Sequence, residues 1–285
     1  MSEAKPLTGP VRKTGPGWTA GLTVPREHPF FFDHPLDHVP GSLTICGLLD
    51  LAESVTGPAG GAERLLLDLR FPAMGTLSGP VELGLAPAPG VPGQWSLLAQ
   101  QADADICAGT LRRVAGLGRP ATAPQPGDAR NSLCPQDLVH RVDEDNIVLG
   151  VPADAGDEVT APAVPPRPGH YLDHGGPAFS ARSLIESSRQ FFTVLEHWAA
   201  GWSYGTTVLW TAFHADLPAS PPSPAYSFRW VREPVKRSKL DVSFDLLDAE
   251  GVVAGRFDYV AITVSAAAYE RFRAARGRLA GEAAA

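Results

Sequence analysis

Residues 28–41 read HPFFFDHPLDHVPG and gather three histidines and two aspartates around a triple phenylalanine. Burying such polar groups beside apolar rings is costly unless they are paired, so the segment predicts a site. Histidine titrates near neutral pH and can act as a general base, which makes His34 the first candidate. In a purely structural alternative, His34 and His38 satisfy backbone carbonyls in a tight turn. Asp33 and Asp37 are then turn or cap residues.

Other chemistries of the same residues are less favoured. The histidines and aspartates could bind a metal ion, but the phenylalanines and prolines suit an apolar wall better, so no metal is expected. The three cysteines are widely spaced and form no CxxC pair, which argues against a disulfide framework or a zinc site. Cys46 could be a nucleophile, but a small buried cysteine is the simpler interpretation. No P-loop is present, and no cofactor is expected.

The apolar pattern predicts the elements that must position these residues. Residues 17–24 read as a strand, and 41–54 as a helix with a stripe of Ile45, Leu48, Leu49 and Ala52. Short Gly/Pro turns separate four further strand-like runs, as in an antiparallel sheet. These runs cover residues 64–71, 80–88, 95–101 and 104–115.

The pattern then restarts after a proline-rich linker. Strands are expected in 138–150, where His140 and Arg141 are read as structural. A long helix is expected over 181–200, with an apolar face that extends to Trp198. Further strands are predicted at 206–213, 225–235, 240–248 and 253–264, and a short helix at 266–279.

The two halves therefore look alike. Each has a loop with His and Asp, one central helix and about four antiparallel strands. Cys46 and Glu186 occupy matching places in the two helices, 140 residues apart. We interpret this as a tandem duplication with an α+β fold. The first repeat would span 1–118, the linker 119–136 and the second repeat 137–285. Joining the two sheets edge to edge would remove two exposed edges.

Three stretches resemble the A-factor biosynthesis hotdog family, the gamma-butyrolactone synthases of actinomycetes. They are HPFFFDHPLDHVPG, LVHRVDEDNIVLG (138–150) and LIESSRQ (184–190). The resemblance implies a double hotdog, in which each of two tandem repeats wraps an antiparallel sheet around a central helix, and it implies acyl-thioester chemistry. Two features differ from that family's pattern. The histidine-rich segment stands in the first half instead of the second, and Cys46 replaces a glutamate.

A weaker resemblance is to hotdog dehydratases that act on 3-hydroxyacyl carrier proteins. It rests on Pro29-Phe30-Phe31-Phe32-Asp33-His34 and on Pro40-Gly41 before the helix. It implies that His34 is catalytic and works with a carboxylate from the other repeat. Glu186, followed four residues later by Gln190, fits that carboxylate, although it could also be a surface charge.

The implied reaction assigns a role to each group. His34 would remove the proton next to the thioester carbonyl. Glu186, with a pKa raised by burial, would protonate the leaving hydroxyl. Amides at the helix start would polarise the carbonyl, with Gly41 allowing close approach. The substrate-binding candidates are Gly41, Gln190, Arg189, Phe31, Phe32, Asp33 and His38, with the phenylalanines as the wall of an acyl tunnel. A second site would pair His170 or His174 with Cys46 and lack an acid.

Composition restricts the partners. Of the 285 residues, 19% are charged, and the formal net charge is −7. No Lys/Arg run exceeds two residues, which argues against nucleic acid. No signal-length apolar segment and no 18-residue apolar run occur, so we expect a cytoplasmic protein without a membrane partner. An acidic carrier protein would need a basic patch, for which 229–239 is the obvious candidate. We expect a monomer or a homodimer.

The leading hypothesis is a dehydratase (lyase) of bacterial secondary metabolism that acts on a 3-hydroxyacyl group carried by acyl carrier protein or CoA. One alternative is a butyrolactone-synthase-like transfer from a 3-ketoacyl thioester to dihydroxyacetone phosphate, with Arg189 and Arg182 as candidate phosphate ligands. The other is a catalytically inactive hotdog that binds an acyl chain.

Overall fold

The computed structural model describes residues 7–60, 63–116, 132–173, 179–221, 223–236 and 238–271. These residues form one antiparallel sheet in the order β1-β2-β4-β5-β6-β3-β9-β12-β11-β10-β8-β7. The first six strands in this order come from the first half of the chain. They are β1 (Arg12–Thr14), β2 (Gly17–Leu22), β4 (Val81–Pro87), β5 (Gln94–Gln101), β6 (Ala104–Ala115) and β3 (Glu63–Arg70). The others are β9 (Val208–Pro218), β12 (Val253–Thr263), β11 (Lys239–Leu247), β10 (Ser227–Val231), β8 (Glu158–Pro162) and β7 (Ala153–Asp154).

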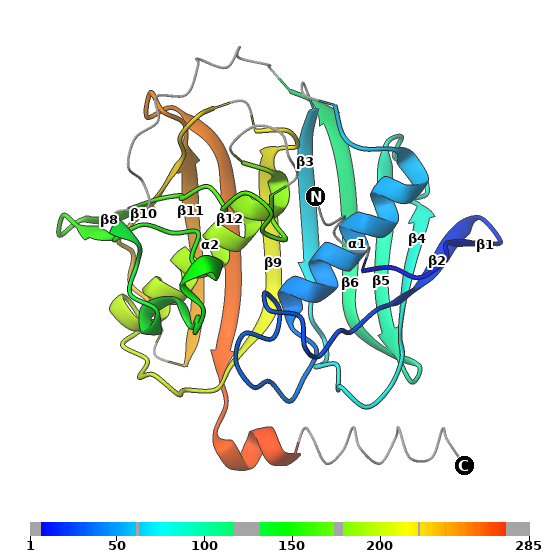
Figure 1. Cartoon of the computed structure of the whole chain (residues 1–285), viewed down its shortest axis with the longest axis horizontal. Coiled ribbons are helices and arrows are strands. Elements are labelled where there is room, and N and C mark those ends of the chain that lie inside the picture. The colour runs from blue at the N-terminus through cyan, green and yellow to red at the C-terminus, as the bar shows by residue number, and fades with distance from the viewer. Residues whose placement is uncertain are drawn as a thin grey trace.

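The two halves meet at β3 and β9, where residues 64–70 pair with residues 212–218 and Leu67 lies opposite Ala215. Both of these residues are buried. Figure 1 shows the resulting continuous sheet, with α1 (Gly41–Thr56) against one half and α2 (Ala181–Trp198) against the other, on the same face. The expected edge-to-edge joining of two antiparallel sheets is confirmed, and so is the α+β class.

The helices bury the predicted faces. Ile45, Leu48, Leu49 and Ala52 of α1 are at most 3% exposed. In α2 the apolar stripe is buried up to Leu195, whereas Trp198 is 36% exposed, unlike the prediction. The difference arises because α2 ends at this residue, beyond the region that packs on the sheet.

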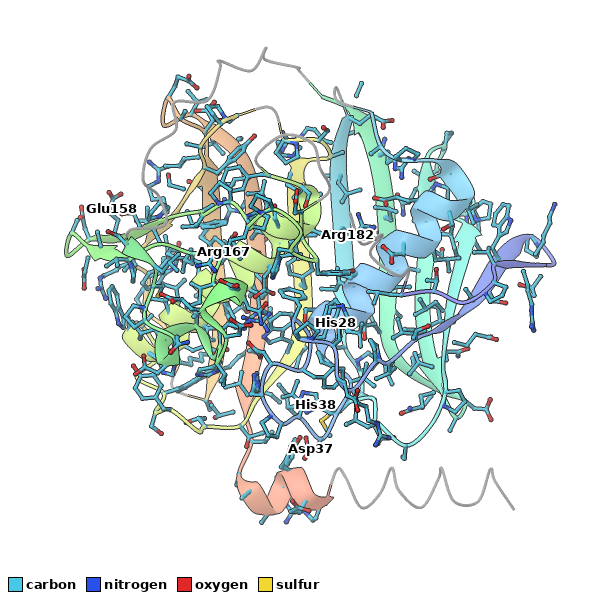
Figure 2. The ribbon with its side chains drawn as sticks, viewed as in Figure 1. His28, Asp37, His38, Glu158, Arg167 and Arg182 are labelled. Carbon is cyan, nitrogen blue, oxygen red and sulfur yellow. The ribbon has the colours of Figure 1, made fainter. Side chains whose placement is uncertain are left out.

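A salt bridge fixes the two helices to each other. Arg182 reaches from α2 to α1, where it donates to Asp50 at 2.7 Å and to Glu53 at 2.8 Å. Figure 2 places Arg182 between the two helices. Because the Arg182 side chain is only 8% exposed, these charged partners are needed to offset the cost of its burial.

The strands expected in 138–150 are not formed, so this prediction was wrong. The chain makes two 3-10 turns, η2 (Asp137–Val139) and η3 (Glu144–Asn146), and then runs extended beside α2. The polar residues between the apolar ones favour turns: the Asp143 side chain accepts from the Asp145 amide and caps η3. Side chains of α2 bind the extended part, since Gln190 accepts from the Val148 amide at 3.0 Å.

Two expected segments lie largely outside the described residues, and the expected basic patch differs from the prediction. Most of the predicted linker lies in 117–131, outside the described residues, and the predicted final helix is described only over 266–271. In the expected basic patch, Arg229 pairs with Asp245 and Arg232 with Asp154, which reduces the positive charge that these two residues offer a partner. Among the described residues, no helix has the length and apolarity that crossing a membrane would require.

Candidate active site

A cavity of about 570 Å³ lies between the start of α1, one side of α2 and the beginning of β9. Its apolar wall includes Phe31, Phe71, Trp210 and Ile262. Its polar residues include His34, His38, His140, Arg141, Arg189, Thr193 and Glu196. The cavity thus brings the predicted histidine of the first half next to the helix of the second half.

His34 is held in one orientation by its neighbour. Its Nδ1 lies 2.6 Å from Oδ1 of Asp33, whose side chain is only 1% exposed. Burial alone would raise the pKa of Asp33, but the hydrogen bond from His34, the Arg141 charge and the Asn146 amide together lower it to about 2. An ionised acceptor at Nδ1 keeps the proton on that nitrogen. Nε2 is then left with the lone pair that a general base needs.

Arg141 links this pair to α2. Its Nη2 donates to Oε1 of Glu186 at 2.8 Å, and its Nη1 lies 3.3 Å from Asp33. Nη1 also donates to the Phe30 carbonyl at 2.6 Å, and the guanidinium stacks on the Phe30 ring. The result is a buried row of alternating charges, Asp33–Arg141–Glu186, that crosses between the halves.

Glu186 does not have the raised pKa that was expected. Burial would raise its pKa, but the charges of Arg141 and Arg189 outweigh burial and lower it to about 2. Arg189 donates Nε to Oε2 at 2.9 Å and Nη2 to Oε1 at 2.8 Å. Glu186 also does not line the large cavity. It is therefore a carboxylate that holds two arginines, and it is a poor proton donor.

Gln190 is also placed differently from the expectation. Its Nε2 donates to the Asn146 carbonyl and to Glu186, both at 2.8 Å, while its Oε1 accepts from the Val148 amide. These bonds occupy both polar atoms of the Gln190 amide, and the side chain is fully buried. Gln190 therefore positions the 146–148 backbone instead of contacting a substrate. Arg189, in contrast, lines the cavity as expected.

The phenylalanines divide between two environments. The loop contains a turn in which the Phe32 amide donates to the His28 carbonyl, and the Phe30 and Phe31 rings contact each other with their centroids 4.8 Å apart. Phe31 lines the cavity, whereas Phe32 packs on the core and does not line it, which corrects the expectation. Phe30 stacks on Tyr171. The triple phenylalanine is thus mainly a core anchor for the loop.

His38 lines the mouth of the cavity. Its Nδ1 is 3.0 Å from Asp37, and the Tyr269 hydroxyl donates to the same carboxylate at 2.6 Å. Figure 2 shows Asp37 and His38 close to the short helix that follows β12. The C-terminal part of the described chain therefore contacts the rim of the site.

The two helix starts differ in a way that separates the two possible sites. Pro40 precedes α1 and provides no side-chain cap, and Pro40, Gly41 and Ser42 line the cavity. The first amides of a helix have no intrahelical acceptor, so those of α1 are left to a ligand or water. A Cβ on Gly41 would lie 3.3 Å from the Trp210 ring. The glycine therefore admits that ring as well as close approach of a ligand. The start of α2 is already satisfied by a capping box of Ser180 and Ser183.

Besides Arg141, which was read as structural, two further residues of the cavity were missed as site residues. Glu186, Arg189, Thr193 and Glu196 follow one another at helical spacing, and this polar stripe could have indicated Glu196 in the sequence. Burial raises the pKa of Glu196 to about 8, although the Arg189 charge opposes the rise. The carboxyl has no hydrogen-bond partner within the described ranges, and it is therefore mostly protonated at pH 7.

The second missed residue is His140, which was read as structural. Its Nε2 lies 3.0 Å from Nε2 of His197, whose Nδ1 is 2.7 Å from the Trp202 carbonyl oxygen. A carbonyl only accepts, so His197 carries its proton on Nδ1 and His140 carries its own on Nε2. Burial and then the charges of Arg189 and His197 lower the pKa of His140 to about 4. His140 also has the left-handed backbone conformation (φ +51°), which few non-glycine residues adopt and which β-branched residues avoid.

The possible second site is closed. The space beside Cys46 has a volume of only about 10 Å³, which is too small for a substrate. Burial raises the pKa of the Cys46 thiol to about 12, and His170 lies 3.0 Å from the Asn146 side chain. His174 lies outside the described residues. No cluster of three potential metal ligands occurs in the described part of the chain.

Comparisons with known proteins bear on the fold. A family model described as the A-factor biosynthesis hotdog domain matches residues 7–46, the part that carries His34. No curated protein matches the sequence. Among solved structures, the dehydratase domain from the CurJ module of curacin polyketide synthase is similar, with a TM-score of 0.64 and 14% identity over 91% of this chain and 98% of that chain.

Two further solved structures have a similar fold. The dehydratase domain of RzxB from Pseudomonas fluorescens has a TM-score of 0.61 and 12% identity, over 90% of this chain and 98% of its own. The dehydratase domain of a mycocerosic acid synthase-like polyketide synthase has a TM-score of 0.58 and 20% identity, over 93% and 96%. The fold of this chain is therefore the double hotdog, and both predicted resemblances are confirmed.

Proposed function

We propose that this protein is a dehydratase-type enzyme that eliminates water from a 3-hydroxyacyl thioester. The observation that carries the proposal is the geometry around His34. The imidazole is oriented by a buried Asp33 carboxylate, and it opens on a cavity at the uncapped start of α1. A base and a set of free amides are what removal of a proton next to a thioester carbonyl requires.

The residues suggest the following steps. The thioester oxygen would accept from the free amides at the start of α1, which stabilise the negative charge that develops there. Nε2 of His34 would then remove the C2 proton. Asp33 stabilises the imidazolium that forms, and Arg141 and Glu186 hold Asp33 in place. Glu186 thereby supports the reaction as a positioning residue.

The similar structures support this reaction class. One of them is described as an inactive mutant of the CurJ dehydratase, in which a histidine is replaced by phenylalanine, in complex with a compound. By analogy, replacement of His34 should inactivate this protein. We propose acyl carrier protein or CoA as the carrier of the acyl group, since both present it as a thioester.

The test is the mass of the acyl group after incubation with a 3-hydroxyacyl carrier-protein thioester. Loss of about 18 Da, one water, by the wild-type protein and not by His34→Ala would support the proposal. His214→Ala is the matched control, because His214 lies on β9 outside the cavity. If the wild-type protein leaves the mass unchanged while it binds the thioester saturably, it is an acyl-binding hotdog, and the proposed reaction is refuted.

A second candidate is acyl transfer from a 3-ketoacyl thioester to dihydroxyacetone phosphate. The match of residues 7–46 to the A-factor family favours it. The two candidate phosphate ligands oppose it, because Arg182 pairs with Asp50 and Glu53 away from the large cavity, and Arg189 pairs with Glu186. Release of free carrier thiol only when dihydroxyacetone phosphate is present would favour this candidate over the dehydratase.

A further inference from the structure

Elimination of water needs a proton donor as well as a base. The leaving hydroxyl is a poor leaving group unless it is protonated, and the ion-paired Glu186 is ill suited to protonate it. A donor must reach the cavity, hold a proton near neutral pH and be free of ion pairs that stabilise its ionised form.

Glu196 meets these three conditions. It lines the same cavity as His34, it is only 4% exposed, and no side chain in the described ranges bonds to its carboxyl. It lies on the side of α2 that carries Arg189 and Thr193, which also line the cavity. Arg189 is largely committed to Glu186, which limits how far its charge can ionise Glu196.

We propose that Glu196 is the catalytic acid of this site and protonates the departing 3-hydroxyl group, an inference that rests on the proposed dehydratase function. The C2–H bond breaks and its proton goes to His34, while its electron pair forms the C2=C3 double bond. The C3–O bond breaks, and its electron pair stays on the oxygen. The oxygen takes the proton of Glu196 and leaves as water. Return of the proton from His34 to Glu196 through solvent restores both groups.

The charged and titratable surroundings are consistent with this division of roles. Burial raises the pKa of Glu196 to about 8, so the acid is protonated at pH 7. Burial and nearby charges keep His140 neutral at the same pH. The titratable and charged groups that line the cavity beside Glu196 are Arg189 on α2, His140 and Arg141 from the segment before η3, and His34 and His38 from the loop before α1.

The experiment compares two leaving groups in the wild-type protein and in Glu196→Gln. The substrates are a 3-hydroxyacyl thioester and its 3-chloro analogue, whose chloride leaves without a proton. For the hydroxy substrate, Glu196→Gln should lower kcat/KM by about 10²–10⁴-fold, the usual contribution of a general acid. For the chloro substrate, the variant should remain within a few-fold of wild type. His34→Ala should slow elimination from both substrates.

The pH profile gives an independent readout. With the hydroxy substrate, wild-type kcat/KM should fall above about pH 8 as Glu196 loses its proton, and this alkaline limb should be absent in Glu196→Gln. Glu158→Gln is the matched control, since Figure 2 shows Glu158 on β8, near the end of the sheet and away from α1, and it does not line the cavity. It should behave as wild type.

The outcomes separate the two proposals. Suppose that the wild-type protein eliminates water and that Glu196→Gln either does so equally fast or is slowed equally with the hydroxy and the chloro substrates. Glu196 is then not the acid, and the dehydratase function stands. If the wild-type protein eliminates neither leaving group, the proposed function itself fails.

Discussion

Arg141 is the residue whose loss should disturb the molecule most, because it joins Asp33 and Glu186 across the two halves. We consider Arg141→Met, which keeps much of the side-chain volume and removes the charge. The variant leaves two buried carboxylates with fewer partners and also removes the donor to the Phe30 carbonyl.

The magnitude follows from Glu186. Its pKa is lowered from 4.5 to about 2, and at about 1.4 kcal/mol for each pKa unit this corresponds to about 3 kcal/mol in favour of the charged form. Arg189 and Gln190 would retain part of that stabilisation, while Asp33 would lose an ionic partner. Breaking a buried ion pair from one side typically costs about 3–5 kcal/mol, so we expect a loss of about 3 kcal/mol in the free energy of unfolding.

The sign of the pH dependence follows as well. A carboxylate with a lowered folded-state pKa stabilises the protein fully above its unfolded value of 4.5, and the contribution is lost as the pH falls toward 2. In Arg141→Met the folded pKa of Glu186 should move back up. The decline in stability between pH 5 and pH 3 should then be shallower than in wild type.

Urea unfolding followed by tryptophan fluorescence, at pH 7 and at intervals down to pH 3, measures both effects. Arg232→Met is the matched control, because its partner Asp154 is solvent-exposed and the pair should contribute little to stability. A loss at Arg141 no larger than at Arg232, or an unchanged pH profile, would refute the reasoning.

Three shorter predictions follow. Asp33→Asn should lower kcat for elimination, because an amide no longer stabilises the His34 imidazolium. The loss should approach, but not exceed, the roughly 10²–10⁴-fold that a general base contributes, and an unchanged kcat would contradict the assigned role. His140→Asn should unfold at nearly the wild-type urea concentration, whereas His140→Val should lose about 1–2 kcal/mol, because asparagine accepts the left-handed backbone and a β-branched residue does not; equal stability would contradict the strain argument. Burial raises the pKa of all three thiols to about 12, so iodoacetamide at pH 7.5 should label none of them until denaturant is added, as intact mass would show.

Most of the helices and strands could be predicted from the sequence, because the spacing of apolar residues along the chain reflects which face of an element is buried. The stripe from Ile45 to Ala52 is the buried face of α1, and the strand-like runs in both halves became strands of one sheet. The segment around His34 could be singled out because its composition is unusual in a buried loop. The expectation failed at 138–150, where the chain forms two 3-10 turns and only isolated β-bridges at Leu149 and Gly150, and where α2 side chains bind the Val148 backbone.

The roles of the acidic residues could not be predicted in this way. Glu186 and Glu196 are similar in sequence terms, ten positions apart on one helix. Folding brings Arg141 to Glu186 from 45 positions away, whereas Glu196 faces a cavity and its carboxyl has no hydrogen-bond partner among the described residues. The sequence by itself therefore determined two halves that each hold one helix against an antiparallel sheet, and it singled out His34 as the candidate base. Only the tertiary structure decided which carboxyl is ionised and which keeps its proton, because a pKa depends on the charges and solvent that surround the group in space.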